Sequence, residues 1–85
     1  MKLNPNFVLR QVADTWVVLP LGEATVNFNG MLTLNESGAL LWQALEQGKD
    51  PVEALLAEYA VSREEAAADV EEFIESLRKV GCLEA

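Results

Sequence analysis

The spacing of apolar residues changes once along this chain, at Asn35. Before that residue, segments such as Thr25–Phe28 and Leu32–Leu34 alternate polar and apolar side chains, which is the period of a β-strand. After it, apolar residues recur every three or four positions, which is the period of an α-helix. One such switch predicts an α+β fold, in which a small antiparallel sheet of about three strands within residues 7–34 precedes the helices.

The segment before Asn35 contains two strand-like runs, Phe7–Val12 and Thr15–Leu19, which are separated by Ala13 and Asp14. Two residues suffice for a tight hairpin turn, so these runs are expected to pair. Asn29-Gly30 is a second turn signal, because both residue types accept a positive φ. Residues 24–34 therefore form either a separate hairpin or one kinked strand, and the pattern favours neither.

Three helices are expected after Asn35, at about residues 36–47, 51–59 and 63–80. Asn35 is a suitable N-cap for the first helix, and Asp50 precedes a proline at the first position of the second. Ser62 and Glu65 have the spacing of a capping box at the start of the third. No linker or repeat interrupts this order, so residues 1–85 are expected to form a single domain.

The chain has no histidine and one cysteine, Cys82. Without histidine, Ser-His-Asp catalysis and imidazole metal ligands are excluded, and a lone cysteine excludes an internal disulfide. We therefore expect no catalytic residue, no metal and no cofactor. Cys82 follows Gly81, where a hydrophobic contact back to the end of the helix is common, so it is expected to be a small apolar packing residue.

The formal net charge of −8 lies entirely in the C-terminal part of the chain. Residues 1–35 carry two basic and two acidic residues, whereas residues 36–85 carry four basic and twelve acidic residues. The short connection between the second and third helices is typical of helix-turn-helix proteins, and together with the sheet it predicts a winged-helix-like architecture. The third helix is itself acidic, however, and DNA binding requires Lys and Arg to neutralise phosphates. Nucleic acid is therefore not expected as a partner.

Charged residues and prolines interrupt every apolar segment of the chain. Arg10, Pro20 and Glu23 end these segments well before the ~20 residues that a membrane span requires. Asn4-Pro5 and Arg10 also break the hydrophobic stretch of any signal peptide. A cytoplasmic protein without a membrane partner is the expectation.

Two motifs are more specific than these patterns. The first is Leu-Asn-Glu-Ser-Gly at residues 34–38, which opens the first helix and is followed by Leu41-Trp42 and Gly48. The second is Asp-Val-x-x-Phe-x-x-x-Leu-x-x-x-Gly at residues 69–81, followed by Cys82-Leu83. In this order, over residues 7–83, the chain resembles the coenzyme PQQ synthesis protein D (PqqD) family. Residues 23–30 look like an insertion relative to the PQQ protein, and the resemblance is closer to family members outside PQQ biosynthesis.

The resemblance implies a non-catalytic peptide chaperone, of the kind called a RiPP recognition element. Such a module binds the leader of a ribosomally synthesised precursor peptide as an added β-strand and presents it to a modifying enzyme, often a radical SAM enzyme. Residues 24–34 carry no charge, whereas edge strands normally carry charges or proline that discourage pairing. An uncharged edge also favours a homodimer through edge pairing or strand swapping.

The expected peptide site joins the strand region to the third helix. By resemblance the preferred edge is Met31–Leu34, with Thr25–Phe28 as the alternative if the insertion forms an outer strand. Trp42 and Phe73 are expected to anchor the core, and the carboxylates of Glu65, Asp69 and Glu72 form either a basic-peptide contact or a solvated face. The expected peptide-binding residues are Thr25, Val26, Asn27, Phe28, Met31, Leu32, Thr33, Leu34, Ala66, Asp69, Val70 and Phe73.

Two other functions are compatible with the sequence. One is a winged-helix transcriptional regulator that dimerises through its sheet or its acidic helix. The other is a structural subunit of a larger complex. A mobility-shift assay at low salt would test the first, and a pull-down from the native host would test the second.

Overall fold

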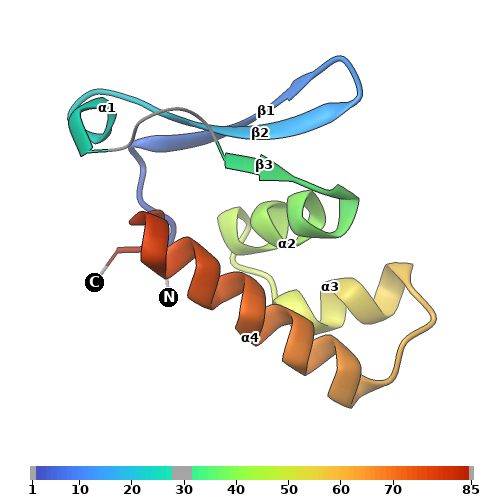
Figure 1. The fold of residues 1–85 in the computed structure, drawn as a ribbon. Helices are drawn as coiled ribbons and strands as arrows, with labels where there is room; N and C mark the ends of the chain where they lie inside the picture. Colours follow the sequence, from blue (N-terminus) through green and yellow to red (C-terminus); the bar gives the residue numbers. More distant parts are fainter. Residues whose placement is uncertain (1, 28–31, 85) are drawn as a thin grey trace.

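The computed structural model describes residues 2–27 and 32–84 (Figure 1). Its elements are β1 (Phe7–Val12), β2 (Thr15–Pro20), α1 (Ala24–Asn27), β3 (Leu32–Leu34), α2 (Glu36–Glu46), α3 (Pro51–Glu58) and α4 (Arg63–Val80). The strands form one antiparallel sheet in the order β1-β2-β3, and α2, α3 and α4 lie on the same side of it (Figure 1). The predicted α+β order, a three-stranded sheet followed by three helices, is confirmed.

The register of the sheet shows which backbone groups face each neighbour. In the β1–β2 pair, Val12 lies opposite Thr15 across the turn at Ala13 and Asp14, as expected from the sequence. Beyond the strand ends, the N–H of Leu21 donates to the carbonyl of Asn6 at 2.6 Å, which continues the same register. Because hydrogen-bonded pairs alternate in an antiparallel ladder, the odd-numbered residues of β2 direct their backbone groups to β1. The even-numbered residues of β2 direct theirs to β3.

The segment after β2 differs from the expectation. Thr25, Val26 and Asn27 were expected in a strand, but they lie in the short helix α1. Local hydrogen bonds explain the difference, because the N–H of Ala24 donates to Leu21 and both the N–H and the hydroxyl of Thr25 donate to the carbonyl of Gly22. The predicted outer strand at Thr25–Phe28 is therefore wrong for residues 25–27. Phe28 and the turn signal at Asn29-Gly30 lie outside the described residues.

The three main helices begin where their capping residues place them. Asn35 Oδ1 accepts from the N–H of Gly38 at 2.8 Å, and Asp50 Oδ1 accepts from the N–H of Val52 at 2.9 Å. Ser62 and Glu65 form the predicted capping box. All three helices start at the residues predicted from the sequence, and α4 also ends at the predicted residue. The helices α2 and α3 each end one residue earlier than predicted.

The core consists of two adjoining clusters. The first contains Trp42, which is 1% exposed, with Phe7, Val18, Leu77 and Cys82. The second lies between α2, α3 and α4, and contains Leu41, Leu55, Ala66 and Val70. Burial raises the pKa of the Cys82 thiol to about 11, because a thiolate loses its hydration there. The predicted packing role of Cys82 and the core position of Trp42 agree with this arrangement.

The hairpin turn contains an identifiable source of strain. Ala13 has φ 56, a left-handed conformation that costs a residue with a Cβ roughly 1 kcal/mol relative to glycine. We expect Ala13→Gly to raise the free energy of unfolding by about 1 kcal/mol, with a rise in Tm of about 4–8 °C for a domain of this size. Thermal and urea unfolding of both chains measures this, and an unchanged midpoint would contradict it.

Candidate functional site

The strand β3 forms one edge of the sheet. Its only strand partner among the described residues is β2, to which it pairs as Trp16 with Leu34, Val17 with Thr33 and Val18 with Leu32. Trp16 and Val18 direct their backbone groups to β3, so Leu32 and Leu34 form the hydrogen-bonded pairs with them. Thr33 lies between these pairs and directs its N–H and C=O away from β2. The open edge therefore presents the backbone donor and acceptor of Thr33.

A groove lies beside this edge, between the start of α2 and the middle of α4. Its volume is about 390 Å³, and its lining residues are Asn35, Ser37, Gly38, Leu41, Leu55, Asp69, Glu72, Phe73 and Ser76. Gly38 connects it to the strand, because a Cβ added at this position would lie 3.3 Å from Leu34 Cβ and 3.4 Å from Phe73 Cε1. The edge strand, the first turn of α2 and the ring of Phe73 are thus in direct proximity.

The groove has an apolar floor and a polar rim. Leu41 and Leu55 are each 3% exposed, and the partly buried Phe73 packs against both core clusters. On the rim, Asp69 and Glu72 are exposed and stand three residues apart on α4. Neither carboxylate has an ion-pair partner among the described residues. An extended peptide could therefore place apolar side chains on the floor and basic side chains at the rim.

The structure brings together only part of the site expected from the sequence. Leu32, Thr33 and Leu34 form the open edge, while Asp69 and Phe73 line the groove. Ala66 is 0% and Val70 is 6% exposed, and both pack into the second core cluster instead of lining the groove. Thr25, Val26 and Asn27 belong to α1. Phe28 and Met31 lie outside the described residues.

Several groove residues were not selected from the sequence as peptide contacts. They are Asn35, Ser37, Gly38, Leu41, Leu55 and Ser76, whereas Glu72 was already a candidate contact for a basic peptide. Gly38 carried a usable signal, because a glycine inside the first turn of a helix costs stability and therefore indicates a close approach of neighbouring groups. Ser76 gave no such signal in the sequence, because a serine on the exposed side of a helix is common. In the structure its hydroxyl donates to the carbonyl of Phe73.

Two features are absent from the described residues, a cluster that could hold a metal ion and a helix that could cross a membrane. Among residues 2–27 and 32–84, no group of three or more His, Cys, Asp or Glu side chains could hold a metal ion. Over the same residues, no helix is long and apolar enough to cross a membrane. What the site offers instead is an unpaired strand edge beside a groove, which is an arrangement suited to binding an extended chain.

Comparison with known proteins agrees with this geometry. The family described as Coenzyme PQQ synthesis protein D matches residues 15–83. The solved structure "TbiB1 in Complex with the TbiA(beta) Leader Peptide" is 30% identical, with a TM-score of 0.82 over 100% of this chain and 96% of that chain. "Lasso peptide synthetase B1 complexed with the leader peptide" is 28% identical, with a TM-score of 0.80 over 99% and 96%. No curated protein matches the chain.

Proposed function

The chain belongs to the coenzyme PQQ synthesis protein D family, and on this premise we propose that it is a non-catalytic chaperone that binds the leader of a precursor peptide and presents it to a modifying enzyme. The observation that carries the proposal is the open edge at Thr33 beside the groove lined by Phe73 and Asp69. Two similar proteins of nearly the same length are known in complex with leader peptides, which supports the same role here.

In the proposed binding mode, the leader pairs antiparallel with β3 as a fourth strand. The N–H and C=O of Thr33 hydrogen-bond to the leader backbone, which provides affinity with little dependence on the leader's sequence. Successive side chains of a strand point to opposite faces. One set of leader side chains therefore faces the groove and is selected by its apolar floor and acidic rim.

The enzyme that receives the leader is proposed to be a radical SAM enzyme or another peptide-modifying enzyme. This assignment follows from the family and not from the groove, since the groove contacts the leader alone. The module supplies no reacting group of its own in this proposal, and the chemistry belongs to the enzyme. Its contribution is to raise the local concentration of the precursor at that enzyme.

Titration with the synthetic leader of the cognate precursor peptide tests the proposal. We expect a Kd near micromolar, about −8 kcal/mol, because an extended peptide loses conformational entropy when it binds. Backbone amide NMR shifts should concentrate on Leu32–Leu34, Gly38, Asp69 and Phe73. Shifts confined to α3 and the α2–α3 connection, with β3 unchanged, would refute strand addition at this edge.

The acidic rim yields a separate prediction. If the leader carries Lys or Arg, Asp69→Lys replaces an attraction with a repulsion and should weaken binding about three- to tenfold at low salt. The loss should shrink as salt is raised, because exposed charges are screened. Glu71→Lys is the matched control, since it makes the same charge change on the same helix outside the groove lining. Equal losses in both variants would indicate a general charge effect instead of a rim contact.

A further inference from the structure

The strand β1 forms the second edge of the sheet, and this edge offers more backbone than β3 does. The odd-numbered residues of β1 direct their backbone groups away from β2, because the even-numbered residues form the hydrogen-bonded pairs with it. The N–H and C=O of Leu9 and of Gln11 therefore face outward, whereas β3 presents those of Thr33. By backbone alone β1 is the better template for an added strand, so a preference for β3 needs another cause.

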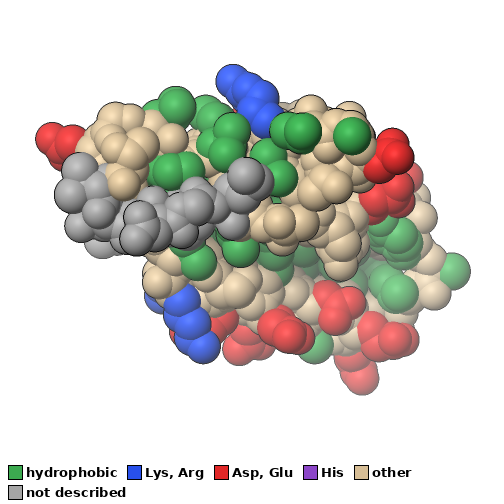
Figure 2. Space-filling model, turned by 45° about the horizontal axis from the view of Figure 1, so that its top comes forward, with side chains coloured by type: hydrophobic (Ala, Val, Ile, Leu, Met, Phe, Trp, Pro, Cys, Tyr) green, Lys and Arg blue, Asp and Glu red, His purple; other side chains and the backbone are tan. Residues whose placement is uncertain are grey.

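A charged side chain occupies the β1 edge. Arg10 is the one charged residue of β1, and its guanidinium donates to the carbonyl of Leu9 at 2.8 Å. Because that carbonyl faces outward, the guanidinium lies where an added strand would place its own N–H. Arg10 has no ion-pair partner among residues 2–27 and 32–84, whose salt bridges are on the helices. Figure 2 shows hydrophobic side chains gathered over the sheet, with acidic side chains mainly over the helices.

The outward residues of β1 define how a second copy of this chain would pair with it. The N–H of Phe7 already donates to the carbonyl of Asn4 at 3.1 Å, which leaves Leu9 and Gln11 to pair. For two copies related by a twofold axis, the register that uses both places Leu9 of each copy opposite Gln11 of the other. In that register Arg10 lies directly opposite Arg10 of the second copy.

Two arginines placed in this way repel each other. Opposite residues of a non-hydrogen-bonded pair are close, about 4.5 Å between Cα atoms, and like charges at such positions destabilise the pairing. Arg10 thus opposes self-pairing in two ways, because it occupies the carbonyl of Leu9 and because it repels its own copy. Without Arg10, β1 would be a strand edge with no charge, which is the kind of edge that pairs with other chains.

We propose that Arg10 closes the β1 edge to a second copy of this chain, and thereby leaves β3 as the edge at which the sheet accepts a strand. The closure concerns how the chain recognises itself, and it does not depend on the leader. Its benefit rests on the proposed function, because a module that binds peptides by strand addition must not lose its edges to self-pairing. The two edges differ accordingly, since Leu32–Leu34 carries no charge and β1 carries one.

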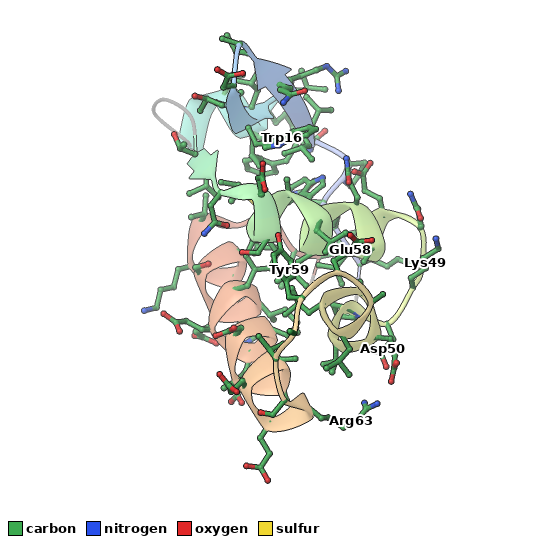
Figure 3. The ribbon with its side chains drawn as sticks, turned by 90° about the vertical axis from the view of Figure 1, so that its right-hand side faces the viewer. Trp16, Lys49, Asp50, Glu58, Tyr59 and Arg63 are labelled. Atoms are coloured by element: carbon green, nitrogen blue, oxygen red, sulfur yellow. The ribbon has the colours of Figure 1, made fainter. Side chains whose placement is uncertain are left out.

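Removal of the charge tests the proposal. We expect Arg10→Thr, which keeps a residue suited to strands, to self-associate with a Kd below about 1 mM, while the native chain stays monomeric at this concentration. Sedimentation equilibrium measures both chains. Lys49→Thr is the matched control, because it makes the same charge change at an exposed residue between α2 and α3, away from the sheet that holds Trp16 (Figure 3). This control should remain monomeric.

A charge exchange tests the register. Arg10→Glu again places like charges opposite each other in two identical copies, so this variant alone should remain monomeric. In an equal mixture with the native chain, opposite charges face each other across the two strands. We expect the mixture to associate about tenfold or more tightly than either chain does with itself. If the mixture associates no better than its components, Arg10 does not face its copy and the proposal is overturned.

A proline at Gln11 locates the association. The N–H of Gln11 faces outward, so Gln11→Pro removes a donor from the β1 edge and none from the sheet. Added to Arg10→Thr, it should restore the monomer, whereas Thr33→Pro added to Arg10→Thr should not. Amide NMR shifts of Arg10→Thr that depend on chain concentration should fall on Leu9 and Gln11. Shifts confined to β3 would contradict pairing through β1.

The outcomes separate this inference from the proposed function, because the association measurements contain no leader. If the native chain binds no leader, the proposed function fails, whatever the oligomeric state of the variants. If Arg10→Thr stays monomeric, or if the native chain already pairs through β1, the closure is overturned. A second equivalent of leader bound by Arg10→Thr without self-association would also overturn it, because the leader would then be the strand that Arg10 excludes.

Discussion

A Thr33→Pro chain is expected to bind the leader about tenfold or more weakly than the native chain, while it remains folded. The register directs the N–H of Thr33 away from β2, so proline removes no hydrogen bond from the sheet and is tolerated at such an edge position. The leader loses one backbone hydrogen bond, about 1 kcal/mol, and also meets the proline ring where its own strand would lie. Calorimetric titration with the synthetic leader measures the loss.

Two variants serve as controls for Thr33→Pro. Gln11→Pro places proline on the other edge strand, β1, at an exposed position whose backbone also points away from β2, so it should leave the leader Kd unchanged. Thr33→Val retains the N–H at position 33 and should bind leader as the native chain does. If all three variants bind equally well, β3 is not the pairing edge.

Trp42→Ala is expected to cause the largest loss of stability in this chain. Trp42 is 1% exposed and joins the sheet to the helices in the first core cluster. Truncating a buried tryptophan costs about 3–5 kcal/mol, whereas a domain of this length has roughly 4–13 kcal/mol in total. We therefore expect Tm to fall by about 15 °C or more, as measured by circular dichroism.

Trp16→Ala provides the comparison for Trp42→Ala. Trp16 lies in the sheet and is only partly buried, so its loss should cost less, about 1–2 kcal/mol. Trp42→Phe keeps most of the apolar volume and should recover most of the lost stability. A Trp42→Ala chain as stable as the Trp16→Ala chain would mean that the first cluster does not hold the sheet against the helices.

Local signals in the sequence were sufficient for most of the fold. The caps at Asn35, Asp50 and Ser62 act within a few residues of themselves, so they predicted the helix starts without knowledge of the rest of the chain. The two-residue turn at Ala13 and Asp14 did the same for the β1–β2 hairpin. The alternation of polar and apolar residues at Thr25–Asn27 wrongly predicted a strand, because hydrogen bonds to Leu21 and Gly22 stabilise a helical turn there.

The candidate site was accessible to sequence reasoning only in part. Leu32–Leu34 and Asp69 could be selected because a family motif and an uncharged strand mark them. Ala66 and Val70 share the helical repeat of Phe73, yet they are buried in the second core cluster. Whether a residue of this repeat is buried or lines the groove depends on the angle and position at which α4 packs against α2 and α3. A periodic pattern contains no information about that packing.

By itself, the sequence determined the β1–β2 hairpin, the three main helices with their caps, the family and the absence of histidine chemistry, because each depends on residue identity or short-range spacing. The tertiary structure alone decided that Thr33 presents its backbone outwards and that Gly38, Leu34 and Phe73 meet at the groove. These features join residues far apart in the chain. They follow from which strands pair and how helices pack, which are properties of the whole fold and not of any segment.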